Sequence, residues 1–310
     1  MLYNGDGIPV NKKEAASYYQ MGADKGHATC MFNYALMLSK GDGITQNKTE
    51  AEKYMKKAAD EGQINAIFTY ASMLHHGDGV TANPKEACKY YKMGIAKGHV
   101  NSMYNCALML YNGDGVQMNK KEAAKYFKMA ADKDKTEAMF NYGLMLYKGD
   151  EIPMNKKEAA KYYKMAAAKG QADAIYNYAL MLSNGDGIPE NKKEAEKLYK
   201  VAAEKGVIEA MYNYALMQYN GDGVPVNKKE ALKYFKIAAE KGHANSMYNF
   251  ALMLFTGDEI QMNKKEAEKY YKLAIEKDQK NAMYNYALML AKGDGVTANK
   301  KEAVKYYKMA

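Results

Sequence analysis

The sequence predicts an all-α fold, a right-handed superhelical solenoid built from 36-residue helix-turn-helix repeats. Three features of every repeat carry this prediction: a loop glycine at a constant interval, an amphipathic helical pattern before it, and a capped second helix after it. The interval is 36 residues throughout, without insertions, as from Gly41 to Gly77. The loop glycines are Gly5, Gly41, Gly77, Gly113, Gly149, Gly185, Gly221, Gly257 and Gly293.

The first helix of each repeat is predicted from its apolar period. Between Ala172 and Asn184, apolar residues fall at i, i+3, i+4 and i+7 and form one stripe that ends at the loop glycine. These residues are Ile175, Tyr178, Ala179 and Leu182. A small residue recurs where the two helices of a hairpin must approach, at Ala35, Ala71, Ala107, Gly143, Ala179, Ala215, Ala251 and Ala287.

The second helix is predicted to begin at a conspicuous start signal. Asn occupies all nine equivalent positions and Glu follows three residues later, as in Asn191 and Glu194. This spacing is typical of a capping box, in which the Asn oxygen accepts a backbone N–H and the Glu reaches back. Pro84 stands at a first helical position, where a missing N–H costs nothing.

The second helix is predicted to end at a left-handed glycine, as at Gly206. Equivalent glycines occur in most other repeats, but Asp134 and Asp278 replace them twice. We expect a small strain or a changed geometry at these two helix ends.

Composition narrows the classes of function. All 45 basic residues are Lys and the net charge is +9, so Arg, the preferred side chain for bidentate base and phosphate contacts, is absent. We therefore expect no specific nucleic-acid partner and only weak, sequence-independent binding of DNA or RNA.

Cys30, Cys88 and Cys106 share no repeat position, which gives neither a disulfide framework nor a zinc pattern. The location of the protein is not encoded, although reducing, cytoplasmic surroundings are favoured. No apolar run has membrane-spanning length and no signal peptide is visible, so no membrane insertion is expected.

The array is predicted to run over 1–310 as a single continuous solenoid without an obvious domain boundary. At 36 residues per repeat, 310 residues make about 8.5 repeats, cut within a repeat at both ends. Capping repeats are missing from both ends. We expect either a segment of a longer array or end-to-end association with neighbouring molecules.

The repeat motif resembles a known family. The stretch from Ala282 to Leu290, the loop Gly293-Asp294-Gly295-Val296 and the capped helix that begins after Asn299 look like the Sel-one-like repeat (SLR) family, a branch of the tetratricopeptide-type solenoids. One repeat departs from the motif at Gln218, where the others have Leu. The resemblance covers essentially the whole chain and implies a scaffold or adaptor that recruits other proteins or peptides.

No catalytic, cofactor or metal site is expected from the sequence. Most loops offer one Asp between two glycines, too few oxygen ligands for a calcium loop, so a glycine turn is the favoured interpretation. Glu replaces the second glycine at Glu151 and Glu259. The adjacent His75 and His76 point about 100° apart on a helix and make a poor ligand pair. His27, His99 and His243 are interpreted as packing residues.

A second set of first-helix residues lies off the buried stripe: Phe32, Phe68, Tyr104, Phe140, Tyr176, Tyr212, Tyr248 and Tyr284, each followed by Asn except in the second copy, which has Thr69. Asn is a poor residue for a helix interior, so its recurrence needs a reason. One alternative is a hydrogen-bond ladder between neighbouring hairpins. The other places the pairs on a concave wall that grips a partner, a position inferred from the resemblance. The predicted partner-binding residues are Tyr104, Asn105, Tyr176, Asn177, Tyr212, Asn213, Tyr248 and Asn249.

Three hypotheses of function remain. The first is a protein-interaction scaffold that binds an extended or helical partner segment. The alternatives are a carbohydrate- or envelope-associated factor and a helical repeat that binds nucleic acid weakly. Partner selectivity is expected to vary along a row of residues of unequal size two positions before each loop glycine. The row is Ser39, His75, Tyr111, Tyr147, Ser183, Tyr219, Phe255 and Ala291.

Overall fold

The computed structural model describes residues 2–4, 9–258 and 260–310, and all regular secondary structure in these ranges is helical. The predicted loop glycine Gly5 and the loop residue Glu259 lie outside the described residues. The chain divides into two compact units, 1–154 and 155–310, each of which is described by itself. The predicted single continuous array over 1–310 stays a prediction.

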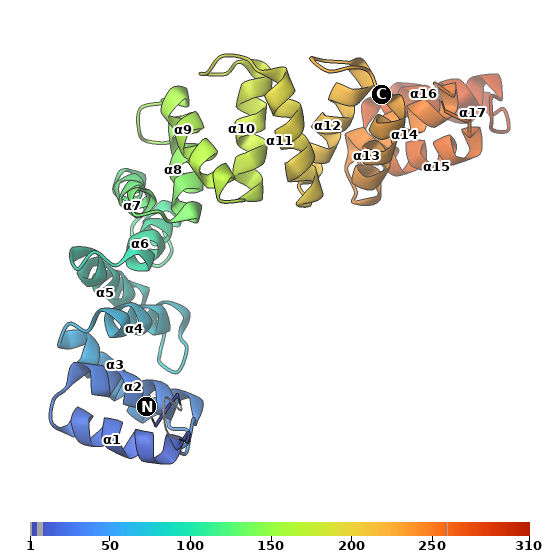
Figure 1. Cartoon of the computed structure of the whole chain (residues 1–310). Helices are drawn as coiled ribbons and strands as arrows, with labels where there is room; N and C mark the ends of the chain where they lie inside the picture. The colour runs from blue at the N-terminus through green and yellow to red at the C-terminus, as the bar shows by residue number, and fades with distance from the viewer. Residues whose placement is uncertain (1, 5–8, 259) are drawn as a thin grey trace. The chain divides into compact units, whose positions relative to one another are not determined.

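Seventeen helices occur in the described residues, and within each unit every helix packs against its neighbours in the chain (Figure 1). The even-numbered helices are the first helices of the repeats: α2 (Ala28–Lys40), α4 (Ile64–His76), α6 (Val100–Asn112), α8 (Thr136–Lys148), α10 (Ala172–Asn184), α12 (Ile208–Asn220), α14 (Ala244–Thr256) and α16 (Lys280–Lys292). The odd-numbered helices are the second helices: α1 (Lys12–Asp24), α3 (Lys48–Asp60), α5 (Pro84–Ala96), α7 (Lys120–Asp132), α9 (Lys156–Ala168), α11 (Lys192–Glu204), α13 (Lys228–Glu240), α15 (Lys264–Ile275) and α17 (Lys300–Met309). The predicted all-α solenoid of helix pairs is confirmed, and its handedness stays a prediction.

Each first helix ends where the sequence predicts. Gly185 closes α10 with φ 65°, in the left-handed region, and its N–H donates to the carbonyl of Met181. The N–H of the following Asp186 donates to the same carbonyl at 3.0 Å. A residue with a Cβ is strained at this φ, which is why glycine recurs at this position.

Each second helix begins with a cap that differs from the predicted box in one bond. The Asn191 Oδ1 accepts the Glu194 N–H at 3.1 Å, as expected. The Glu194 Oε2, however, accepts from the Asn191 side-chain Nδ2 at 3.1 Å rather than from its backbone. The backbone N–H of Asn191 is already bound to the carbonyl of Leu182 at 2.8 Å, which ties the start of α11 to the last turn of α10.

The two aspartates that replace a cap glycine keep the left-handed backbone. Asp134 has φ 73° and Asp278 has φ 58°, whereas the equivalent glycines have φ between 80° and 97°. The helix α7 that ends before Asp134 keeps its full 13 residues. The cost of the substitution is local backbone strain, because Asp134 is a non-glycine residue with a positive φ. At Asp278 the helix α15 ends one residue early, with 12 residues, so the geometry changes.

The core consists mainly of alanines, aromatic rings and methionines, with one buried leucine near the end of most first helices. Ala179 and its counterparts are fully buried, which lets the two helices of a hairpin lie close together. Edge-to-face tyrosine pairs join first and second helices, as between Tyr214 and Tyr234 with ring centroids 4.7 Å apart. The exceptional Gln218 is 6% exposed, and its Nε2 donates to Glu196 at 2.8 Å.

In the part of the chain that the structure describes, no helix has both the length and the apolar character needed to cross a membrane.

Candidate partner-binding site

The predicted partner-binding residues lie on the first helices, on a surface that we call the first-helix wall. It is defined by the recurring aromatic-Asn pairs and by the leucine three residues after each Asn. The eight predicted residues are all half-buried. Tyr104 and Asn105 lie on α6 in the first unit, and the other six residues lie on α10, α12 and α14 in the second unit.

Where the preceding repeat carries a wall tyrosine, asparagines of the wall form the hydrogen-bond ladder that the sequence left as one of two alternatives. Asn141 Nδ2 donates to the Tyr104 hydroxyl of the preceding repeat at 3.3 Å. The same bond joins Asn213 to Tyr176 at 3.4 Å. Burial raises the pKa of Tyr104 and of Tyr176, so these hydroxyls stay neutral and serve as acceptors.

Other asparagines of the wall form different hydrogen bonds. Asn105 Nδ2 also lies 3.3 Å from the Tyr91 hydroxyl on the preceding second helix. Asn177 instead donates to the backbone carbonyl of Asp173 at 2.7 Å. These contacts use the Nδ2 atom of the amide, and the Oδ1 atom takes no part in them. The ladder therefore explains why Asn recurs without using up the hydrogen-bonding capacity of the wall.

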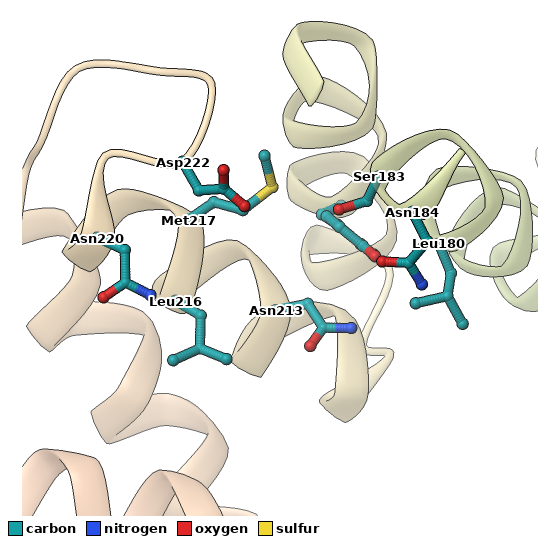
Figure 2. Close-up of a pocket in the computed structure, with 9 residues that line it drawn as sticks. Leu180, Ser183, Asn184, Asn213, Leu216, Met217, Asn220 and Asp222 are labelled. Carbon is teal, nitrogen blue, oxygen red and sulfur yellow. The ribbon is translucent and has the colours of Figure 1, made fainter. Parts of the chain in front are cut away.

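Hollows open on the first-helix wall at the same place in three repeats. Each one is lined by the ladder Asn, the wall leucine that follows it, the next methionine, and an aromatic residue from a second helix. The largest measures about 180 Å³ and lies between α10 and α12 (Figure 2). Its lining is Leu180, Ser183, Asn184, Tyr199, Asn213, Leu216, Met217, Asn220 and Asp222.

The other two hollows belong to the first unit and match this one at spacings of 72 and 180 residues. The hollow of about 170 Å³ is lined by Leu108, Tyr111, Asn112, Phe127, Asn141, Leu144 and Met145. The hollow of about 80 Å³ is lined by Tyr3, Tyr19, Asn33, Leu36 and Met37.

Sequence reasoning placed Asn213 on this surface but missed the wall leucines. Leu180 and Leu216 are half-buried and line the hollow, whereas Leu182 belongs to the buried stripe. The signal was present in the repeated Ala-Leu-Met-Leu motif, because its two leucines are two residues apart and cannot share one helix face.

The loop aspartates have a definite structural partner. The Nζ of a lysine at the start of the preceding second helix binds the carboxylate, as between Lys120 and Asp150 at 2.9 Å. Lys120, followed by the Tyr111 hydroxyl, holds the pKa of Asp150 below its usual value. The equivalent pairs are Lys12–Asp42, Lys48–Asp78, Lys156–Asp186, Lys192–Asp222, Lys228–Asp258 and Lys264–Asp294.

One repeat lacks this lysine because Pro84 occupies its position, and there His75 replaces it. The His75 Nε2 lies 2.8 Å from the carboxylate of Asp114. The Nδ1 of the adjacent His76 lies 2.9 Å from the carbonyl of Ser72. The two histidines therefore have separate structural contacts. In the described ranges, no three His, Cys, Asp or Glu residues are grouped so that they could hold a metal ion.

Comparison with known proteins accounts for this architecture. The Sel1 repeat profile matches the entire chain in nine consecutive copies, at residues 1–27, 28–63, 64–99, 100–135, 136–171, 172–207, 208–243, 244–279 and 280–310. The chain belongs to the Sel1 repeat family. Sel1 repeat proteins generally act as non-catalytic scaffolds for protein interactions.

Two solved structures share the fold of these Sel1 repeats. One is c5321, a protective antigen of uropathogenic Escherichia coli with an SLR fold, at 24% identity and a TM-score of 0.85. The match covers 95% of this chain and 63% of c5321, so the chain spans less than two thirds of that protein. The other is a Sel1 repeat protein from Oxalobacter formigenes, at 23% identity and a TM-score of 0.74, covering 94% of this chain and 85% of that one. A search of curated protein sequences gave no match.

Two of the histidines interpreted as packing residues also cap Sel1 first helices. The His99 Nδ1 accepts the Ser102 N–H at 3.2 Å and lies 2.9 Å from the Ser102 hydroxyl. His243 makes the same contacts with Ser246. Burial lowers the pKa of both rings, which favours the neutral form that an accepting nitrogen requires. The side chain of His27 makes no such bond.

The Sel1 repeats also bring together two cysteines that the sequence did not pair. Cys88 on α5 and Cys106 on α6 are buried, with their Sγ atoms 3.9 Å apart. They lie 18 residues apart, at different positions of the repeat. Only the packing of one second helix against the following first helix makes them neighbours.

Proposed function

We propose that this chain is a protein-interaction scaffold whose first-helix wall binds an extended or helical segment of a partner protein. The observation that carries the proposal is the recurrence of one hollow at equivalent positions of three repeats. Hollows at equivalent positions of the repeat suit a peptide ligand, because each can hold one side chain of a bound segment.

The lining of the hollows supports a peptide ligand. The wall leucines offer apolar surface to a side chain, while the asparagine amides offer hydrogen bonds to a backbone. Both kinds of contact are typical of peptide grooves. We assign no catalytic role, cofactor or specific nucleic-acid ligand to the wall. Most of the loop-proximal lysines are engaged with loop aspartates, as in Lys192 with Asp222, which removes them from a nucleic-acid surface.

The eight predicted wall residues contribute to the proposal in different ways. Asn213 lines the largest hollow. Tyr104 and Tyr176 accept ladder bonds, and Tyr212 packs against His243 with ring centroids 4.8 Å apart. Alanine at these positions would weaken the repeat stack as well as the wall. A test of binding therefore needs substitutions outside the ladder.

Exposed asparagines at the mouths of the hollows provide that test. Asn112, Asn184 and Asn220 are exposed, and the equivalent positions of other repeats carry Lys, as at Lys40 and Lys148. The triple substitution of these asparagines by lysine should therefore leave the fold intact while crowding the hollows with charge. Proteins captured by the wild-type chain are identified by mass spectrometry, and their binding segments are then titrated against both forms by calorimetry.

We expect the triple variant to bind such a segment at least about tenfold more weakly. The matched control replaces three exposed residues of second helices, Lys157, Lys193 and Lys229, with alanine and should bind like the wild type. Equal affinity of the wall variant and the wild type would refute the assignment of the wall. Selective retention of carbohydrate rather than protein would favour the envelope-associated alternative.

A further inference from the structure

The hollow beside Ser183 differs from its counterparts in the hydrogen bonding and the exposure of its loop carboxylate, Asp222. In the two counterpart hollows, a tyrosine of the preceding repeat donates its hydroxyl to the second carboxylate oxygen: Tyr111 to Asp150 Oδ2 at 2.7 Å, and Tyr3 to Asp42 Oδ2 at 2.8 Å. Tyr219 makes the same bond to Asp258 Oδ2 at 3.1 Å. Serine at the equivalent position is far shorter than tyrosine.

The exposure of the carboxylates follows this difference. The side chains of Asp150, Asp42 and Asp258 are 20%, 22% and 29% exposed, whereas that of Asp222 is 46% exposed. Asp222 Oδ1 accepts from Lys192 at 2.5 Å, as in the other repeats. The position of the missing tyrosine is therefore open on the Oδ2 side of Asp222.

The opening is bordered by an aromatic residue of a second helix. Where the internal tyrosine is present, it lies against an aromatic residue of the second helix, as Tyr111 does against Phe127 with centroids 6.3 Å apart. In the open hollow that aromatic residue is Tyr199, which lines the hollow together with Ser183. Figure 2 shows Ser183 on one side of the space and Asp222 on the other.

We propose that the hollow between α10 and α12 is a binding site for a tyrosine side chain of a partner segment. The ring enters between Leu180 and Leu216, and its hydroxyl donates to Asp222, as the internal Tyr111 does to Asp150. This site deepens the proposed function and rests on it, because it names the side chain that anchors the partner to the wall.

The charges of the site favour a phenol over a cation or an anion. Asp222 is already neutralised by Lys192, so an arginine or lysine of the partner would meet a like charge beside the carboxylate. A phosphorylated tyrosine would bring negative charge against Asp222 and add bulk. A neutral hydroxyl donor meets neither penalty. Phosphorylation of the partner tyrosine would therefore release it.

The test uses small probes on the complete chain. Methyl-labelled Leu and Met resonances are followed by NMR during titration with N-acetyl-tyrosine amide and with its phenylalanine, arginine and phosphotyrosine analogues. We expect saturable shifts of Leu180, Leu216 and Met217 with the tyrosine probe. The phenylalanine probe loses the hydrogen bond to Asp222, and the arginine and phosphotyrosine probes meet unfavourable charge. All three should therefore bind at least about tenfold more weakly.

Two variants locate the binding. Ser183→Tyr reproduces the internal tyrosine of neighbouring repeats, so it should fold normally and abolish the shifts. Asp222→Asn should weaken the tyrosine probe while leaving the hollow open. The control Ser39→Tyr changes the equivalent position of another repeat and should leave binding at Leu180 unchanged. The converse substitution Tyr111→Ser should create a second site, with shifts at Leu108 and Met145.

The inference is wrong if phenylalanine or arginine probes bind as well as tyrosine, or if Ser183→Tyr binds like the wild type. Its failure is separable from that of the scaffold assignment. A partner segment that is lost from the lysine-substituted wall but retained by Ser183→Tyr supports the scaffold and refutes the tyrosine site. A segment that both variants retain refutes both.

Discussion

The histidine caps of the first helices predict that two repeats weaken in mild acid. The His99 Nδ1 can accept the Ser102 N–H only while the ring nitrogen is unprotonated. Because burial lowers the pKa of His99 in the folded protein, protonation favours the unfolded chain. The stabilisation is therefore complete above the pKa of an unfolded histidine, about 6.5. It is lost as the pH falls through the lower pKa of the folded protein.

The size of the effect follows from the bond that is lost. Removing a side-chain N-cap costs about 1 kcal/mol, which corresponds to an approximately fivefold increase in local opening of α6. His243 should give an effect of the same size in α14, in the other unit. Because neighbouring repeats contribute separately to the stability of a solenoid, the loss should be localised to these helices.

The chain itself supplies the neutral replacement. In other repeats Gln caps the first helix without a titrating group: Gln63 Oε1 accepts the Ala66 N–H. The double substitution His99→Gln and Ser102→Ala copies that pair and should remove the pH dependence of α6. The control His27→Gln acts on α2, at a residue whose side chain makes no cap bond, so it should leave the pH dependence of α6 unchanged.

Native-state hydrogen exchange near pH 7.5 and pH 5, corrected for the intrinsic exchange rate, measures the opening of α6 directly. The wild type should lose protection in α6 at the lower pH, and the double variant should not. An equal loss in both proteins, or no loss in the wild type, would refute the reasoning.

Four further predictions concern the contacts within the repeats and the exposed surface of α1. Asn191→Ala removes both bonds of a helix start and should lower the free energy of unfolding by about 1–2 kcal/mol, measured by urea denaturation, whereas Asn191→Ser should recover most of it. Tyr111→Phe deletes the hydrogen bond to Asp150 at a partly exposed site and should cost only about 0.5–1 kcal/mol; a larger loss would mean that the ring also moves. Ala179→Leu adds bulk at a fully buried helix contact and should destabilise by about 1–3 kcal/mol or more in the same assay; a stabilised variant would contradict the close packing of α10 and α11. Tyr18 and Met21 on α1 are 58% and 53% exposed, so light scattering should show association that rises with concentration, and a monomer at all concentrations would exclude the predicted end-to-end contact.

The sequence by itself determined the secondary structure of the repeat. The C-terminal end of α10 is marked by Gly185, and the two ends of α11 are marked by Asn191 and Gly206. These ends could be predicted because cap preferences depend on backbone geometry within a few residues. The buried stripe through Tyr178 and Ala179 was also predicted correctly, since helix periodicity decides which side chains share a face. Repetition then extended each local assignment along the chain, and the same residues carried the resemblance to Sel1 repeats.

Only the tertiary structure decided what the side chains off that stripe do. The sequence left Asn213 between a ladder and a partner contact, and the answer depended on the Tyr176 hydroxyl, 37 residues earlier in the chain. The opening at Asp222 likewise depends on Ser183, 39 residues before it, because a tyrosine there would reach the carboxylate. Such contacts join neighbouring repeats, so they are set by how the hairpins stack, and no pattern within one repeat contains that information.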